Sequence, residues 1–257
     1  MRAAAEEKSV KRVVLCSSVV AISSGYTGTT KEEFDENDWS NLDATLSPYE
    51  RSKHKAERAA WDFIKECKAS GRDLEMSVIN PSFIGGPAIT GNYFPGGEII
   101  QILLTRRYPA LARINLPICD VRDVAKAHLK AMTVPEAANK RIIVSSYDDT
   151  DVVQLAELLR EEFGQFGYNV PTMEIPRWLV CIGGLFSPTF KFYYTLIGQK
   201  TSYSDENRRR ILEMEQVYDW KTSMLSMAYS LIENGTIRKT PEYEGVPKRY
   251  AYETARE

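Results

Sequence analysis

The alternation of short apolar runs with a long helical segment constrains the fold of this chain more than any other feature of its sequence. Residues 11–16, 74–79 and 141–145 are apolar runs of strand length. Between the first two lies a helical pattern, residues 48–69, which ends at Ser70-Gly71. Strands that alternate with crossover helices pair in parallel, with right-handed connections. The sequence therefore predicts an α/β fold with a parallel sheet.

The overall composition excludes several classes of protein. The 257 residues are 43% hydrophobic and 26% charged, which are ordinary globular values. A net charge of −2 gives no electrostatic reason to expect a nucleic acid or an anionic membrane as partner. The four widely spaced cysteines and two histidines predict no metal site and favour reduced thiols in a cytoplasmic protein. The most apolar stretch, residues 178–185, is too short to span a bilayer.

The start of the helical segment combines a capping signal with an acid/base pair. Ser47 is a predicted N-cap, followed by Pro48 and by Glu50, which would complete a capping box. Tyr49 and Lys53 are four residues apart, so they share one face of the first turns. A phenol has an ordinary pKa of about 10, and a neighbouring positive charge lowers the pKa of a phenol. Such a pair can exchange a proton with a substrate oxygen, although a chain with 14 tyrosines contains this spacing by chance about once.

The rest of this helix is expected to pack against the sheet through one stripe of side chains. The stripe predicted to face inward consists of Tyr49, Lys53, Ala56, Ala60 and Phe63. His54 lies off this stripe, and we expect it to be exposed and without a catalytic role.

The second apolar run ends in a segment rich in proline and glycine, Asn80 to Pro87. The carboxyl ends of parallel strands are where α/β folds bind ligands, and a plain turn is the alternative. Further along the chain, residues 151–163 have the pattern of an amphipathic helix, and the composition after Pro171 becomes aromatic and apolar. The tail after Asn234 is expected to be loosely attached.

Four motifs occur in a fixed order along the chain: Ser17-Ser18 after a strand, Tyr49-x-x-x-Lys53, Asn80-Pro81, and residues 120–125. Together they resemble the extended short-chain dehydrogenase/reductase family, which is NAD-dependent epimerase/dehydratase-like, and its dihydroflavonol-reductase-like group most closely. The resemblance extends to about Trp220.

The resemblance implies a Rossmann-like parallel sheet with a small, mainly helical C-terminal lobe. Residues 1–147 would be part of a dinucleotide-binding domain, with 86–119 contributing to the substrate lobe. Residues 148–257 would form the C-terminal substrate lobe and tail.

The resemblance also implies roles for individual residues. Tyr49 would donate or accept the proton, Lys53 would tune its pKa and bind the cofactor ribose, and Ser18 would hold the substrate oxygen, with Ser17 as the alternative. The residues implied to bind the cofactor are Ser17, Tyr49, Lys53, Pro81, Ser82, Phe83 and Ile84. The cofactor would be NADP or NAD, with NADP slightly favoured, and no metal is expected.

The chain departs from the family pattern at its beginning. No G-x-x-G-x-x-G motif occurs anywhere, whereas the family carries one in its first strand–helix turn. We therefore expect a truncated form, in which the glycine-rich turn and the first strands, roughly 100 residues, precede Met1. The remaining sheet should have three strands and an exposed edge, and binding of NAD(P)H should be weak or absent.

These features predict an NAD(P)-dependent oxidoreductase that reduces a small carbonyl or oxidises the alcohol, incomplete as it stands. Two alternatives remain: a sugar-nucleotide epimerase of the same family, or a non-catalytic remnant that serves as a binding module. The expected partner is a small-molecule substrate, and the sequence predicts no oligomeric state.

Overall fold

The computed structural model describes residues 1–26, 31, 33–89, 95–185, 194–215 and 217–251. The chain forms two compact units. Unit 1 consists of Met1–Ser82, Arg122–Ser146 and Thr201–Val217, and unit 2 consists of Phe83–Val121, Tyr147–Lys200 and Tyr218–Glu257. Each unit therefore collects segments that are far apart in the sequence.

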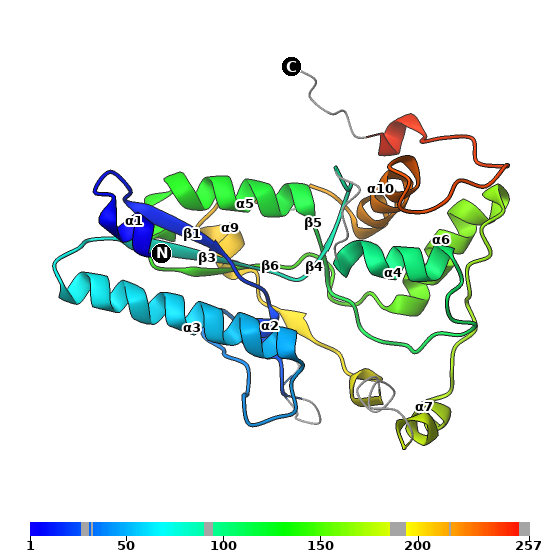
Figure 1. Ribbon diagram of the computed structural model, residues 1–257, viewed down its shortest axis with the longest axis horizontal. Helices are drawn as coiled ribbons and strands as arrows, with labels where there is room; N and C mark the ends of the chain where they lie inside the picture. Colours follow the sequence, from blue (N-terminus) through cyan, green and yellow to red (C-terminus); the bar gives the residue numbers. More distant parts are fainter. Residues whose placement is uncertain (27–30, 32, 90–94, 186–193, 216, 252–257) are drawn as a thin grey trace. The chain divides into compact units, whose positions relative to one another are not determined.

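Unit 1 is built on a three-stranded parallel sheet. Its elements are α1 (Arg2–Glu6), β1 (Arg12–Cys16), α2 (Val20–Ser23), β2 (Glu33–Phe34), α3 (Pro48–Ala69), β3 (Glu75–Pro81), nearly all of α5 (Val121–Thr133), η1 (Pro135–Ala137), β6 (Arg141–Val144), β7 (Ser202–Tyr203) and α9 (Glu206–Arg210). The strand order is β1-β3-β6, and α3 and α5 cover opposite faces of this sheet (Figure 1). The predicted α/β class, the three parallel strands and the edge position of β1 among the described residues are confirmed.

The register of this sheet brings the ends of its strands together. Cys16 is paired with Ile79, and Pro81 is paired with Val144. Because all three strands run in the same direction, their carboxyl ends meet at one edge, where α/β folds collect functional groups. A second, two-stranded parallel sheet of β2 and β7 places Phe34 against Val19, Ile22 and Ile143.

Helix α3 begins as predicted but buries a different face. The Ser47 side chain accepts from the Glu50 N–H and the Glu50 side chain accepts from the Ser47 N–H, so the capping box is confirmed. The helix ends at Ala69, and Gly71 follows with φ +79°. The buried side chains are His54, Glu57, Ala60, Ile64 and Cys67.

The predicted inward stripe of α3 was therefore wrong by about one residue. Tyr49 is 54% exposed, and Ala56 is exposed, whereas His54, expected in solvent, is 7% exposed. The His54 ring packs edge-on against Trp39, with 5.3 Å between the ring centroids. Of the predicted stripe, only Ala60 is buried. The pattern misled because the true inward face also carries the polar side chains of His54 and Glu57, which a stripe of apolar residues does not predict.

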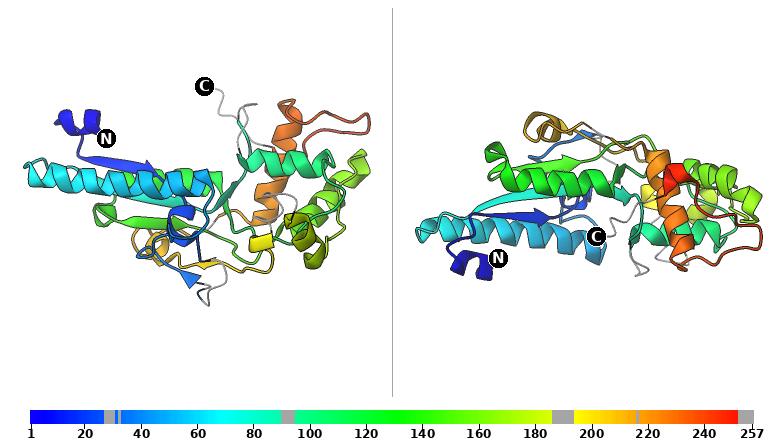
Figure 2. Two further views of the ribbon diagram at one scale, coloured as in Figure 1. Left: turned by 60° about the horizontal axis from the view of Figure 1, so that its bottom comes forward. Right: turned by 90° about the horizontal axis from the view of Figure 1, so that it is seen from above.

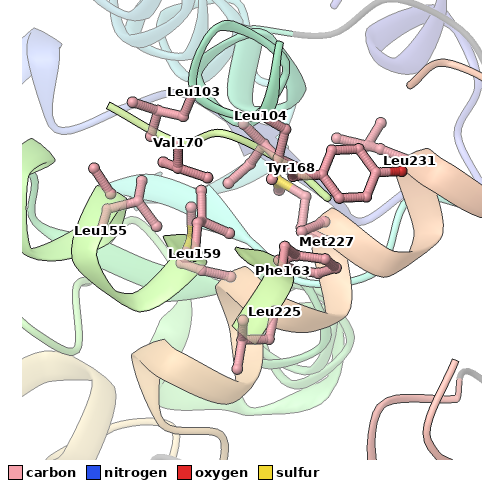
Figure 3. Packing of buried hydrophobic residues seen from close by; sticks show 14 of the residues in the cluster. Leu103, Leu104, Leu155, Leu159, Phe163, Tyr168, Val170, Leu225, Met227 and Leu231 are labelled. Atoms are coloured by element: carbon pink, nitrogen blue, oxygen red, sulfur yellow. The ribbon is translucent and has the colours of Figure 1, made fainter. Parts of the chain in front are cut away.

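Unit 2 is mainly helical and has an apolar core. Its elements are β4 (Phe83–Gly85), α4 (Pro95–Leu104), β5 (Ile118–Asp120), α6 (Val152–Phe163), η2 (Gly164–Phe166), α7 (Arg177–Gly184), α10 (Trp220–Glu233) and η3 (Lys248–Tyr250). Helices α4, α6 and α10 pack together (Figure 2). Leu103, Leu159, Phe163 and Leu225 point into the core between these helices (Figure 3).

The C-terminal segment is part of this core. Ile237 is 2% exposed, and Tyr243, Val246 and Tyr250 pack against the same cluster. The prediction of a loosely attached tail was wrong for these residues, because the aromatic rings bury more apolar surface than the scattered charges and prolines suggest. The predicted amphipathic helix at 151–163 is confirmed as α6, which begins with an Asp151 capping box.

Candidate active site

Polar side chains gather in unit 1 where β1 and β3 end. The backbone N–H of Ser17 donates to the Ile79 carbonyl at 2.8 Å, and the N–H of Val19 donates to the Pro81 carbonyl at 3.0 Å. The pairing of the two strands therefore continues past Cys16 and holds the Ser17-Ser18 peptide in place.

The two serine hydroxyls differ in what they bind. Ser17 Oγ donates to Glu57 Oε2 at 2.5 Å inside the protein. Ser18 Oγ accepts a hydrogen bond from the Val20 N–H at 3.3 Å. Among the described residues, no acceptor binds the proton of the Ser18 hydroxyl. Ser17 is thus tied into the structure, whereas the Ser18 hydroxyl can donate to an oxygen that is brought to it.

Helix α3 places Lys53, and with it Tyr49, beside the two serines. Lys53 Nζ donates to the Ser17 carbonyl at 3.4 Å and lies 5.9 Å from the centroid of the Tyr49 ring. Tyr49 itself is 54% exposed, so its phenol is open to a ligand. The structure therefore places four of the predicted site residues, Ser17, Ser18, Tyr49 and Lys53, in one cluster.

The cluster rests on a buried carboxylate that the sequence prediction missed. Glu57 is 1% exposed, and its Oε2 also accepts from Asn80 Nδ2 at 2.9 Å. Asn80 Nδ2 also donates to the Ser18 carbonyl at 3.1 Å. Glu57 and Asn80 together therefore fix the backbone that carries both serines.

The charge of Glu57 is balanced by an arginine at the start of β6. Arg141 Nε donates to Glu57 Oε1 at 2.6 Å, and the Trp61 indole donates to the same oxygen at 3.3 Å. Glu57 follows Lys53 by four residues on α3, which is a local signal that could have drawn attention to it. Arg141 is 84 residues away in the sequence, and no local pattern links the two.

An exposed thiol lies directly before the serines. A hydrogen bond with His128 of α5 lowers the pKa of the Cys16 thiol, opposed by partial burial and assisted by the charges of His128 and Lys53. The same bond raises the pKa of His128, whose Nδ1 lies 2.8 Å from the Val124 carbonyl. Cys16 and His128 therefore form a thiol–imidazole pair beside the site.

The other predicted cofactor residues divide between the two units. In unit 1, Pro81 ends β3, and Ser82 is 8% exposed with a hydroxyl that has no partner among the described residues. In unit 2, Phe83 and Ile84 belong to β4 and pair in parallel with Ile118 and Cys119 of β5.

Neither a metal centre nor a membrane span is found in the part of the chain that the structure describes. No three histidine, cysteine, aspartate or glutamate side chains are placed there to hold a metal ion, and no helix is long and apolar enough to cross a bilayer.

Comparison with known proteins agrees with this fold. The family model for the NAD dependent epimerase/dehydratase family matches residues 1–145. More than half of the chain is matched, so the chain belongs to the NAD dependent epimerase/dehydratase family. The family predicted from the four motifs is therefore confirmed.

The curated relatives include several reductases. The chain is 31% identical over 176 residues to the NADPH-dependent methylglyoxal reductase GRE2 of Saccharomyces cerevisiae, covering 63% of this chain and 51% of that protein. It is 31% identical over 179 residues to dihydroflavonol 4-reductase of Arabidopsis thaliana, covering 67% of this chain and 44% of that protein. The chain thus spans about half the length of the curated relatives it matches.

Comparison with solved structures shows the same fold. Gre2 from Candida albicans is 28% identical, with a TM-score of 0.67 over 87% of this chain and 65% of that chain. Vestitone reductase from alfalfa is 18% identical with a TM-score of 0.65, and this likeness shows the fold alone.

Proposed function

We propose that the protein is an NADP- or NAD-dependent oxidoreductase that reduces a small carbonyl compound, or oxidises the corresponding alcohol. The observation that carries this proposal is the cluster in unit 1. Lys53 bridges the Ser17 carbonyl and the Tyr49 ring, and the neighbouring Ser18 hydroxyl has a proton to donate. The curated relatives, which are mostly named as reductases, support it.

The residues divide the reaction between them. A bound nicotinamide cofactor supplies the hydride that adds to the carbonyl carbon. Tyr49 donates its phenolic proton to the carbonyl oxygen, so that hydride and proton together give the alcohol. Ser18 donates a hydrogen bond to the same oxygen and orients the carbonyl group. In the oxidising direction the Tyr49 phenolate takes the proton back.

Lys53 and Glu57 position this machinery in different ways. Lys53 holds a positive charge beside Tyr49. It also binds a ribose hydroxyl of the cofactor in this proposal, which is the role that the family resemblance implies. Glu57 does not reach the reacting atoms. It receives bonds from Ser17 and Asn80 and so fixes the backbone before Ser18.

Cofactor binding is proposed for Ser17, Tyr49, Lys53, Pro81, Ser82, Phe83 and Ile84. The buried Ser82 hydroxyl, without a partner among the described residues, fits a polar cofactor group at the end of β3. NADP is favoured over NAD because the names of several relatives specify NADPH. We assign cofactor binding to residues 1–147 and substrate binding to 86–119 and 148–257.

Two further assignments belong to the same proposal. The partner is a small-molecule substrate, as the relatives' names suggest for those proteins. The four cysteines are free thiols, which favours a reducing compartment such as the cytoplasm.

The reductase reading is preferred to the epimerase alternative, because the curated relatives named above are reductases. The structural likeness to a nucleoside-diphosphate-sugar epimerase from Pseudomonas aeruginosa is at 14% identity and shows the fold alone. An epimerase returns its hydride to the substrate, so it consumes no nicotinamide cofactor overall.

The test is NADPH consumption with methylglyoxal and with a flavonoid ketone, at millimolar NADPH so that weak binding does not hide turnover. The wild-type chain should oxidise NADPH, and Ser18→Ala should lower the rate by about 10²-fold because one bond to the substrate oxygen is lost. The exposed Ser9→Ala is the control and should keep the wild-type rate. Nucleotide binding measured by calorimetry without any NADPH consumption would contradict the reductase proposal and favour the binding module.

A further inference from the structure

Cys16, the last residue of β1, carries an exposed thiol that the proposed reaction does not use. Side chains alternate between the two faces of a strand. Val13 and Leu15 pack against the core cluster on the α3 side of the sheet. The other face of β1 carries Arg12 and Cys16, and Arg12 Nη1 donates to the Ala131 carbonyl of α5 at 2.8 Å. Cys16 therefore lies on the face of the sheet that α5 covers (Figure 1).

A histidine of α5 faces this thiol and is oriented by its own helix. The imidazole of His128 is hydrogen-bonded to Cys16, and its Nδ1 lies 2.8 Å from the Val124 carbonyl. Because a carbonyl oxygen only accepts, Nδ1 carries a proton, and Nε2 is left to accept from the thiol. A nucleophile beside a base that a third group orients is the arrangement of an activated thiol.

A second cation lies next to the thiol along the chain. Lys53 of α3 donates to the carbonyl of Ser17, the residue that follows Cys16. The bond with His128 lowers the pKa of the Cys16 thiol, partial burial opposes this, and the charges of His128 and Lys53 assist it. The thiolate is the reactive form of a cysteine. The same two cations attract a reagent that carries carboxylates.

We propose that Cys16 is a modification site, which forms a mixed disulfide with a small anionic disulfide such as glutathione disulfide. The Cys16 thiolate attacks one sulfur of that disulfide, so a bond forms between this sulfur and Cys16 Sγ while the original S–S bond breaks. Cys16 is oxidised, and the departing half of the reagent is reduced. It leaves as a thiolate and takes its proton from the imidazolium of His128.

A mixed disulfide at Cys16 would also affect the candidate active site, and this effect rests on the proposed function. Cys16 is joined directly to Ser17, whose carbonyl binds Lys53. The adduct brings carboxylates and bulk beside that lysine. Modification should therefore lower the reductase rate, and reduction of the adduct with dithiothreitol should restore it.

The test treats the folded protein with glutathione disulfide at pH 7 and maps the adducts on all four cysteines by mass spectrometry. Cys67 and Cys119 are buried and should stay unmodified. Cys16 should react at least about threefold faster than Cys181, which is exposed on α7. His128→Asn should slow the reaction at Cys16 and leave the rate at Cys181 unchanged. Equal rates at Cys16 and Cys181, or a Cys16 rate that His128→Asn does not change, would overturn the proposal.

The adduct is measured without turnover, so its formation and the proposed function are tested separately. NADPH consumption is then compared before and after modification, with Cys16→Ser as the control that cannot form the adduct. The wild-type rate should fall on modification, and the Cys16→Ser rate should not. An unchanged rate with Cys16 fully modified would overturn the link to the active site. An unmodified protein that forms the adduct but consumes no NADPH would contradict the proposed function and leave the modification site in place.

Discussion

Helices α3 of unit 1 and α10 of unit 2 are both packed against the rest of their units, but they bury different chemistry. The side chains that helix α3 buries include the imidazole of His54 and the carboxylate of Glu57. The nine side chains that α10 buries include no charged group and are dominated by methionine, leucine, isoleucine and tyrosine. A buried charge stabilises only when its partners are in place, whereas apolar burial is not directional. Unit 1 is thus held in one arrangement by specific bonds, and that arrangement carries the candidate active site.

The aromatic cluster of unit 2 shows the opposite principle. Phe163 is fully buried, and its ring centroid lies 4.7 Å from that of Tyr229 and 6.0 Å from that of Tyr168. Such contacts tolerate small shifts, because attraction depends on area and approximate ring geometry. Unit 2 is therefore held chiefly by apolar contact, to which single polar bonds, such as that from the Tyr229 hydroxyl to Glu162, are added.

The largest expected effect comes from breaking the buried ion pair of unit 1. Glu57→Gln leaves Arg141 buried without its counter-charge and should lower the free energy of unfolding by about 3–5 kcal/mol. Hydrogen exchange measured by mass spectrometry should show faster exchange in unit 1. The control is Asp62→Asn on the same helix, which breaks an exposed pair with Lys65 and should cost under about 1 kcal/mol. Equal losses in the two variants would contradict the contrast between the units.

A slightly smaller loss is expected from a cavity in unit 2. Leu159 is fully buried in α6, so Leu159→Ala should lower the free energy of unfolding by about 2–5 kcal/mol. The faster exchange should be confined to unit 2. Leu185→Ala, at a residue that is 79% exposed, should have almost no effect. Faster exchange in unit 1 after Leu159→Ala would show that the units do not respond separately.

The cap of α10 should contribute about 1 kcal/mol, in a pH-dependent way. Asp219 accepts from the Thr222 N–H at 3.0 Å. Burial opposes ionisation of Asp219, but its bonds with Thr222 and nearby N–H groups lower its pKa overall. The stabilisation is therefore present above the unfolded pKa and is lost as the pH falls through the folded pKa. Asp219→Ala should cost about 1 kcal/mol at pH 7, and the difference from wild type should shrink below about pH 4 in urea unfolding.

The smallest change concerns reactivity rather than stability. The lowered pKa of Cys16 predicts faster alkylation by iodoacetamide at pH 7 than at Cys181 of unit 2, which is also exposed. His128→Asn should remove part of this advantage, because it removes the bond that lowers the pKa. Raising the pH until both thiols are ionised should also abolish the difference in alkylation rate between Cys16 and Cys181. Equal rates at pH 7 would contradict the thiol–imidazole pairing.

The sequence predicted the features that depend on neighbouring residues and missed those that depend on residues far apart in the chain. The capping box of Ser47 and Glu50 depends on residues three apart, and it was predicted correctly. The burial of Glu57 depends on Arg141, 84 residues further on, and was missed along with the true face of α3. Ile237 was missed for a similar reason, since its burial depends on a core assembled from distant helices.

The features of the candidate site also separate into those that local sequence signals predict and those that distant residues determine. The motifs placed Ser18, Tyr49 and Lys53 correctly at the end of β1 and the start of α3, because strand ends and helix starts have local signals. The difference between the Ser17 and Ser18 hydroxyls could not be predicted, because it is set by the missed carboxylate of Glu57.

The central claim is that Tyr49 transfers the proton, and Tyr49→Phe tests it most directly. The variant removes only the hydroxyl of a side chain that is 54% exposed, so the unfolding free energy should stay unchanged. The rate of carbonyl reduction at millimolar NADPH should fall by about 10²–10⁴-fold, as expected when a general acid is lost. Ser9→Ala, at an exposed residue before β1, should keep the wild-type rate. A folded Tyr49→Phe variant that retains full activity would contradict the account.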